Sequence, residues 1–398
     1  MESSLAERSP SGPAHHRTSP WGLIIQAAAA LAAAMGIGRF VFTPILPLME
    51  AQAGLSAQAG AQLATANYIG YLLGALAGIA IPALVRSAAV LRTSLAVLVA
   101  SLALMPAVDS ASLWFVLRLL AGASSALVFV VVVSSMLSGL PESTRHLAGW
   151  GFGGVGAGIA LSGLLVALVR TAATWQSAWW ICAAATGLLA AAAWRMPMAD
   201  QAETGRLSGD RPRTGKWFAA LWASYTLEGI GYIIAGTFLV AAVQDGASDL
   251  VGNSVWIIVG LAAIPSCVLW AWLARRWSRP LLLLISLTIQ ALGIALPALV
   301  QGTAAKLIAA ALFGATFMGV SSLALAIGDH LQAPRSVALL TAGYSLGQIL
   351  GPLLAAPLLH NGYGQAMLLG GAMVLAAAAA AALVCLRFPH NLAHRTAS

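Results

Sequence analysis

The sequence predicts an all-α membrane protein whose twelve transmembrane helices form two pseudo-symmetric six-helix bundles. Three observations lead to this prediction: the composition, the number of long apolar runs, and a long polar stretch near the middle of the chain. Of the 398 residues, 60% are hydrophobic and 8% are charged, whereas about a quarter of the residues in a soluble domain are charged. The chain therefore lacks the polar side chains needed to cover a water-facing surface.

The long apolar runs give the number of helices. The hydrocarbon core of a bilayer is about 30 Å thick, so a spanning helix needs roughly 20 mostly apolar residues. Runs of about this length recur along the chain, and they are too long for the strands of a membrane β-barrel, which alternate over about ten residues. Helices are predicted at residues 21–49, 57–85, 91–108, 111–139, 146–169, 174–195, 216–243, 251–274, 280–300, 304–328, 335–359 and 364–387.

Polar segments divide the chain into domains. Residues 1–20 are polar and rich in Pro and Ser, which predicts a disordered cytoplasmic N-terminus. They lack the apolar core and cleavage site of a signal peptide, so the first helix is expected to be retained. The longest interior polar stretch, 196–216, is predicted to be a cytoplasmic linker. It separates an N-terminal bundle, 21–195, from a C-terminal bundle, 217–388, and residues 389–398 form a cytoplasmic tail.

The basic side chains predict the orientation, because cytoplasmic segments of membrane proteins carry an excess of Lys and Arg. With the N-terminus placed inside, only Arg170 and Lys306 fall on the outer side. Both termini are therefore predicted to be cytoplasmic, and the formal net charge of +8 requires no nucleic-acid partner. Sixteen of the 20 Lys and Arg residues fall in cytoplasmic segments: Arg8, Arg17, Arg86, Arg92, Arg145, Arg195, Arg206, Arg211, Arg213, Lys216, Arg275, Arg276, Arg279, Arg335, Arg387 and Arg395.

The two halves of the chain resemble each other. The fourth and tenth predicted helices carry Gly-Ala pairs in matching places, at 122–123 and 314–315. The fifth helix is glycine-rich, and the eleventh contains the stretch "GYSLGQILGP". Parallel six-helix repeats are typical of transporters whose binding site lies near the bilayer midplane between the repeats. A central site between the two halves is therefore expected.

Three charged residues lie deep within predicted helices: Arg39 in the first, Arg118 in the fourth and Glu228 in the seventh. A charge at the bilayer centre costs at least about 2.5–3.5 kcal/mol, so such side chains usually face a wet cavity or a partner. Counting about 1.5 Å of rise per residue places all three charged groups in the outer half of the membrane. They are expected to converge into a site with two positive charges and one negative charge.

Three roles remain open for this trio. In the first, Glu228 carries a proton whose uptake and release are tied to substrate exchange. In the second, Glu228 neutralises one arginine while the other presents its planar fork to a substrate carboxylate or phosphate. In the third, a fixed Arg–Glu pair simply holds the two halves together. The first two roles favour an anionic or zwitterionic cargo, because the site carries a net positive charge.

Polar and aromatic side chains on three helices accompany the trio. They recur at helical spacing on the second, seventh and eleventh predicted helices. Aromatic rings with hydroxyl groups suit an amphipathic organic cargo, although helix packing is an alternative role. The predicted substrate-binding residues are Arg39, Arg118, Asn67, Tyr71, Tyr225, Tyr232, Tyr344 and Gln348, and Gly74 and Gly78 are predicted to serve helix packing.

Two prolines follow Arg39 in the stretch "RFVFTPILPLM". Pro44 and Pro47 have no N–H groups, so the carbonyl groups of Phe40 and Thr43 lose their helical donors. The outer end of the first helix is expected to kink there. The kink is either part of an extracellular gate or purely structural.

No motif points to an enzyme, a metal or a cofactor. The stretch "GFGGVG" at 151–156 lies inside a predicted helix with no strand before it, so close helix packing explains it better than a dinucleotide site. Cys182, Cys267 and Cys385 are isolated in apolar runs and are interpreted as small hydrophobic residues. Walker and HExxH motifs do not occur in the sequence.

The stretches "GIGRFVFTPILPLM", "TANYIGYLLGAL" and "GYIIAGTFLVA" resemble the YbfB/YjiJ-type branch of the major facilitator superfamily. The resemblance covers essentially the whole chain after residue 20. It implies the major facilitator fold, with the first, fourth, seventh and tenth helices lining a central cavity. It also implies secondary active transport across the bacterial inner membrane, and it leaves the cargo open.

Motifs of the superfamily occur in partial form. Arg118 followed by Gly122 resembles the arginine motif of the fourth helix that many members link to proton coupling. The stretch "GQILGP" at 347–352 matches an exporter pattern, but it lies in the eleventh helix instead of the fifth. The loop at 82–92 lacks the aspartate of the usual gating motif. The exporter pattern, although displaced to the eleventh helix, favours export slightly, and import is left open.

These observations together predict a monomeric, proton-coupled exporter of a small organic anion or zwitterion that works by alternating access. Glu228 and Arg118 are the predicted proton-coupling residues, and the expected partners are a small-molecule substrate, protons and the lipid bilayer. A proton-independent uniporter or exchanger of the same fold is the first alternative. A non-transporting membrane sensor or assembly factor is the second, and a membrane-embedded enzyme is the third.

Overall fold

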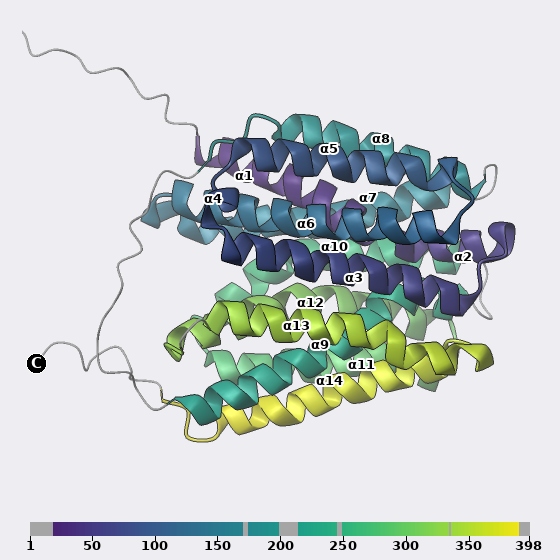
Figure 1. Ribbon diagram of the computed structural model, residues 1–398. Coiled ribbons are helices and arrows are strands. Elements are labelled where there is room, and N and C mark those ends of the chain that lie inside the picture. Colours follow the sequence, from purple (N-terminus) through teal and green to yellow (C-terminus); the bar gives the residue numbers. More distant parts are fainter. Residues whose placement is uncertain (1–18, 170–173, 199–213, 245–248, 334–335, 390–398) are drawn as a thin grey trace, which may run out of the picture.

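A computed structural model describes residues 19–169, 174–198, 214–244, 249–333 and 336–389. In these ranges all regular secondary structure is helical, and twelve helical segments are long and apolar enough to cross a membrane (Figure 1). The predicted fold class is thereby confirmed. The predicted N-terminal segment, most of the predicted linker and the predicted C-terminal tail lie outside the described residues, as do Arg8, Arg17, Arg170, Arg206, Arg211, Arg213, Arg335 and Arg395.

The first half of the chain supplies six membrane segments. The first segment consists of three pieces and the third of two. The elements are α1 (Pro20–Leu31), the π-helix η1 (Ala32–Arg39), α2 (Phe42–Ala53), α3 (Ala57–Ala80), α4 (Pro82–Val85), α5 (Ala88–Leu104), η2 (Met105–Ala107), α6 (Ala111–Gly139), η3 (Glu142–Leu147), α7 (Ala148–Val169) and α8 (Trp175–Ala193).

The second half supplies the other six. The elements are α9 (Gly215–Gln244), α10 (Asp249–Leu273), α11 (Arg279–Leu299), α12 (Thr303–His330), α13 (Ser336–Ala355), η4 (Ala356–Asn361) and α14 (Gly364–Cys385). Predicted and observed segment ends differ by at most five residues. The largest difference is at α3, which ends at Ala80 because Pro82 starts the separate turn α4 and disfavours helical backbone at the residue before it.

The halves pack side by side, the first drawn in purple to teal and the second in green to yellow (Figure 1). The most extensive contacts between them are those of α7 with α10, α3 with α13 and α2 with α9. The glycines predicted to serve packing create the α7–α10 contact: a Cβ atom added to Gly156 would lie 2.7 Å from the Gly260 carbonyl oxygen. Gly153 and Gly156 of the "GFGGVG" stretch thus pack against the other half, and Gly151 and Gly154 pack within their own half.

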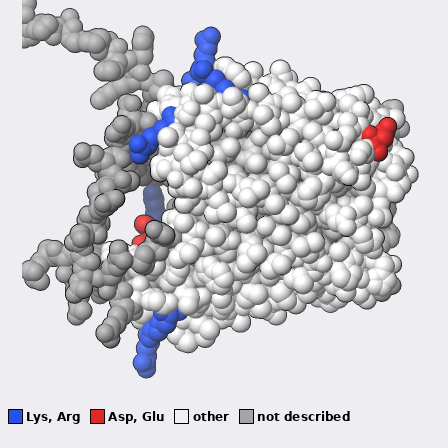
Figure 2. All heavy atoms as spheres, in the orientation of Figure 1, with Lys and Arg blue, Asp and Glu red and all other residues white. Residues whose placement is uncertain are grey.

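The visible charged side chains lie at the two ends of the bundle and leave a broad uncharged band between them (Figure 2). The visible Lys and Arg residues lie at the end where the described chain begins and finishes, here called the terminal end; acidic side chains are visible at both this end and the opposite, distal end. Large apolar side chains such as Leu188 and Leu168 are exposed in membrane helices. The chain is therefore a multi-pass membrane protein.

Lys306, counted from the sequence on the outer side of the membrane, lies inside the helix predicted there. It is buried in the first turn of α12, and its Nζ donates a hydrogen bond of 2.9 Å to the Val243 carbonyl at the end of α9. Lysine side chains commonly bond the unpaired carbonyls of helix C-termini. Lys306 thereby ties the distal ends of two helices of the second half together.

Candidate functional site

The first membrane segment is irregular at its centre. The π-helix η1 ends at Arg39, and a turn at Phe40 and Val41 separates it from α2. Pro44 has no N–H group to donate, and the Phe40 carbonyl instead accepts from the Thr43 N–H at 3.1 Å. Short π-helical stretches occur frequently at functional sites. The sequence indicated a break near the prolines but gave no sign of the π-helix before it.

Arg39 is placed by this break in the middle of the protein. Its side chain is 2% exposed, and Nη2 donates a hydrogen bond to Oε1 of Gln348 on α13, in the other half. The guanidinium also lies over the rings of Tyr71, 3.9 Å from the centroid, and Tyr68, 5.5 Å away. Such cation–π contacts stabilise a charge where water is excluded. Nε has no hydrogen-bond partner among the described residues.

Arg118 of α6 lies beside Arg39. Its side chain is 1% exposed, its Nη2 donates to the Arg39 carbonyl at 3.3 Å, and its guanidinium lies 4.9 Å from the Phe42 ring centroid. Within the described part of the chain, Nε and Nη1 of Arg118 have no acceptor. The structure therefore brings two guanidinium groups together and leaves three of their nitrogen donors unpaired.

Glu228 of α9 is fully buried and interacts within its own half. Its Oε1 accepts a hydrogen bond of 3.2 Å from Gln290 Nε2 on α11, and the Tyr344 hydroxyl is a second hydrogen-bonding neighbour. Oε2 has no partner among the described residues. Glu228 and the arginines thus have separate partners here, in contrast to the fixed ion pair considered from the sequence. Gln290 escaped the sequence prediction, although it is a lone amide in an apolar helix.

Aromatic rings form a wall between these charged groups. Tyr225 and Tyr344 stack with centroids 4.2 Å apart, and Tyr232 stacks on Tyr344 at 5.5 Å and on Phe317 at 5.9 Å. Three of the four predicted tyrosines therefore lie together, and the fourth, Tyr71, lies at Arg39. Phe317 was not predicted, because nothing in its local sequence distinguishes it from a core residue.

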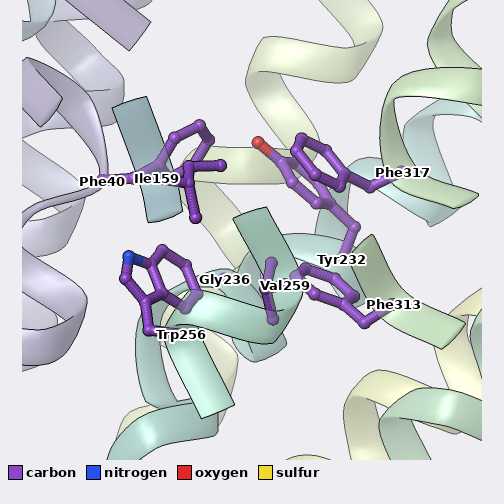
Figure 3. A pocket seen from close by; sticks show the side chains of 8 residues that line it. All are labelled: Phe40, Ile159, Tyr232, Gly236, Trp256, Val259, Phe313 and Phe317. Carbon is purple, nitrogen blue, oxygen red and sulfur yellow. The ribbon is translucent and has the colours of Figure 1, made fainter. Parts of the chain in front are cut away.

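Phe40, next to Arg39, packs across the interface between the halves. Its ring edge meets Phe317 at 6.3 Å and Trp256 at 6.4 Å (Figure 3). The gap that these side chains share with Tyr232 and Phe313 is too narrow for a water-sized sphere. The centre of the molecule is occluded in this conformation.

Asn67, a predicted substrate-binding residue, lies against the main chain of Arg118. Its Nδ2 donates a 3.0 Å hydrogen bond to the Arg118 carbonyl, and a Cβ atom on Gly122 would collide with the Asn67 carbonyl. A Cβ atom on Gly74 would likewise collide with Ala123. Asn67 therefore holds α3 against α6 in this conformation, and Tyr71 is the predicted α3 residue that reaches Arg39.

The two halves are hydrogen-bonded on the distal side of the site. Besides the Arg39–Gln348 bond, three hydrogen bonds between the halves occur among the described residues, at the level of Arg39 or nearer the distal end. The sequence did not predict these contacts, because each joins segments far apart in the chain. They join Thr43 Oγ1 to the Gly236 carbonyl, the Tyr68 hydroxyl to Thr237 Oγ1 at 2.9 Å, and the Tyr363 hydroxyl to Glu50 Oε1.

Comparisons with known proteins give a family and a fold. Residues 31–385 match the family described as "Uncharacterised MFS-type transporter YbfB". A crystal structure of an aspartate-to-alanine mutant of the nucleoside transporter NupG is similar, with a TM-score of 0.68 and 14% sequence identity over 92% of this chain and 98% of that chain. No curated protein matches the chain. At this identity the structural likeness shows the fold alone.

Proposed function

The chain belongs to the family of uncharacterised MFS-type transporters represented by YbfB, and from this premise we propose that it moves a small organic anion or zwitterion across the bacterial inner membrane. The mechanism is alternating access coupled to protons, and the working unit is a monomer. The observation that carries the proposal is the pair of buried guanidinium groups with unpaired donors, Nε of Arg39 and Nε and Nη1 of Arg118.

The chemistry of these donors favours an anion. A buried donor without a partner costs about 1–3 kcal/mol, and more when it is charged. A carboxylate or phosphate between the guanidinium groups would accept from several of these donors at once and offset that cost. Gln348 Nε2, next to Arg39, is a further donor without a partner among the described residues. Two arginines and Glu228 leave one net positive charge, which a monoanion or a zwitterion's carboxylate would neutralise.

The aromatic wall favours a cargo with an apolar, flat body. Tyr225, Tyr232, Tyr344 and Phe317 offer stacked ring faces beside the arginines, and stacked rings gain about 0.5–1.5 kcal/mol beyond their buried area. Phe40 occupies the position next to this wall in the occluded conformation. Separation of the halves would withdraw Phe40 and expose the ring faces to a substrate.

Glu228 is the proposed proton carrier, and α13 is its connection to the anion site. Tyr344, beside Glu228, and Gln348, bonded to Arg39, are four residues apart on α13 and hence on one face. A substrate anion that displaces Gln348 from Arg39 would act on the same helix that carries Tyr344. A movement of α13 on substrate binding would therefore shift Tyr344 relative to Glu228 and change the protonation of Glu228.

Orientation and direction are part of the same proposal. The terminal end faces the cytoplasm, because the described Lys and Arg residues visible in Figure 2 gather there. Export is proposed from the exporter-like pattern of Gly347, Gly351 and Pro352 on α13. These glycines also serve packing, since a Cβ atom on Gly351 would lie 2.7 Å from the Ile230 carbonyl. Accumulation of substrate in everted vesicles, and not in right-side-out vesicles, is the expected result.

The test is proton release or uptake by purified protein in weakly buffered detergent during addition of an organic-anion library. Uncharged nucleosides are included, because the similar NupG structure is that of a nucleoside transporter. We expect an anion to bind with a pH change that vanishes in Glu228→Gln, and the exposed carboxylate variant Asp329→Asn to behave as wild type. Binding without a pH change would indicate a uniporter or exchanger. Preferential binding of uncharged nucleosides would contradict the anion site.

A further inference from the structure

A groove of about 650 Å³ lies on the N-terminal half between α5 and α8, away from the central site. This volume falls within the roughly 300–1,000 Å³ of typical small-molecule sites. Small side chains line it, among them Ala96 and Ala100 of α5 and Ala191 of α8, all of which are exposed. Gln26 of α1 adds a polar group to this apolar lining. The groove therefore opens toward the surrounding lipid.

Gly187, which also lines the groove, differs from the glycines of the helix interfaces. A Cβ atom on Gly70 or Gly156 would collide with the backbone of a neighbouring helix. A Cβ atom on Gly187 would meet only the Val99 side chain, at 3.9 Å. Helix packing thus does not require a glycine at this position, and its effect is to leave the groove open.

Two arginines lie at the terminal end of the groove. Arg195 lines it, is exposed, and has no hydrogen bond or ion pair among the described residues. Arg92 is fixed nearby, because its Nε donates a 3.1 Å hydrogen bond to the Trp194 carbonyl. Its guanidinium lies 5.9 Å from the Trp194 ring centroid. An apolar groove thus ends in two positive charges and a Trp, a residue enriched at membrane–water interfaces.

We propose that this groove is a binding site for an anionic phospholipid. One acyl chain lies between α5 and α8, and the headgroup phosphate lies at Arg92 and Arg195. The charge distribution selects this occupant: the apolar lining excludes a soluble anion from most of the groove, and the arginines favour an anionic over a zwitterionic headgroup. With the terminal end in the cytoplasm, the site faces the leaflet whose anionic lipids attract each basic side chain by about 1 kcal/mol.

The test is native mass spectrometry of the full chain in neutral detergent, with phosphatidylglycerol and phosphatidylcholine of equal chain length as probes. We expect the first lipid adduct of phosphatidylglycerol to form at least tenfold more tightly than that of phosphatidylcholine. Arg195→Gln, which removes no internal contact, and Gly187→Leu, which fills the groove, are each expected to weaken phosphatidylglycerol binding at least fivefold. Arg276→Gln is the matched control, since Arg276 also lies by a Trp, 5.5 Å from the Trp272 ring centroid.

Three results would overturn the proposal. The first is equal affinity of the wild type for the two lipids. The second is a failure of the groove variants to differ from their controls: either both bind phosphatidylglycerol as tightly as the wild type, or Arg276→Gln loses as much phosphatidylglycerol affinity as they do. The third is full competition by glycerol phosphate, which has no acyl chains and would identify a soluble-phosphate site. None of these results depends on transport, so the lipid site and the proposed function are tested separately.

Discussion

Arg39 is stabilised in an apolar segment by neutral neighbours: an amide oxygen from Gln348 and the ring faces of Tyr71 and Tyr68. A buried ion pair would compensate the charge fully but would also fix the two halves together. Neutral partners orient the guanidinium and leave its charge available. Arg39 therefore has a defined position, and its positive charge remains available to an anion.

At this scale, Arg39→Lys is expected to weaken binding of the substrate anion at least tenfold, about 1.4 kcal/mol. Lysine keeps the charge but loses the planar fork and the stacking on Tyr71. Isothermal titration of purified protein measures the change, with Arg276→Lys at the terminal end as control. Unchanged affinity in Arg39→Lys would show that only the charge matters at this position.

The two halves meet in two different ways. Glycines pack α7 against α10, and hydrogen bonds of Thr43, Tyr68 and Tyr363 join the halves on the distal side of the site, here called the distal closure. The glycine contacts leave no room for another atom, since a Cβ atom on Gly156 would lie 2.6 Å from the Ile264 nitrogen. The polar contacts are single hydrogen bonds that can break and re-form. The first type keeps two helices together, and the second type can open.

Gly156→Ala is therefore expected to lower the melting temperature, because overpacking costs about 1–3 kcal/mol. Gly187→Ala is the matched control, since its added methyl group meets nothing nearer than 3.9 Å. Thermal unfolding in detergent, followed by tryptophan fluorescence, compares the two variants. Equal melting temperatures would mean that the α7–α10 interface adapts to the extra methyl group.

We expect Tyr363→Phe to raise the fraction of molecules whose distal closure is open, because the substitution removes the hydroxyl that bonds Glu50. One hydrogen bond contributes about 0.5–1.5 kcal/mol, which corresponds to a roughly 2- to 13-fold change in the open fraction. The open fraction is measured through the reactivity of a thiol introduced by Gly236→Cys. The substitution fits the closed structure, since a Cβ atom there meets only side chains at 3.6 Å or more.

The labelling is measured in a variant whose three native cysteines are replaced by alanine. The comparison is the labelling rate by a membrane-impermeant maleimide with and without Tyr363→Phe. The control is Tyr363→Phe combined with a thiol at the exposed residue Asp109, whose rate is expected to stay constant. An unchanged rate at Gly236→Cys would exclude the Glu50–Tyr363 contact as part of the gate.

On the scale of the whole molecule, the surface charges visible in Figure 2 lie at the two ends, and a broad uncharged band separates them. The concentration of Lys and Arg at the terminal end predicts that both termini are cytoplasmic. A protease-cleavable tag at either terminus is expected to resist protease in intact spheroplasts and to be removed once the membrane is permeabilised. Cleavage in intact spheroplasts would invert the proposed orientation and, with it, the proposed direction of transport.

Part of the candidate site was predictable because intramembrane charges are rare. Arg39, Arg118 and Glu228 stand out against an apolar background, and the structure buries all three. Their partners were not predictable in the same way. Gln290 and Phe317 acquire a role only through neighbours from other helices, and Asn67 bonds the main-chain carbonyl of Arg118 instead of a guanidinium group.

The sequence by itself determined the number of the membrane helices, and their ends to within five residues, because an apolar run of about 20 residues matches the bilayer thickness wherever it occurs. That match is a local property of each run. Only the tertiary structure decided that Arg39 meets Gln348, 309 positions away, and that Glu228 meets Gln290 instead of an arginine. Such contacts depend on how the helices rotate and pack against each other. Glycines between helices set this packing, and the helices that they join are far apart in the sequence, so a local sequence pattern does not reveal the contacts.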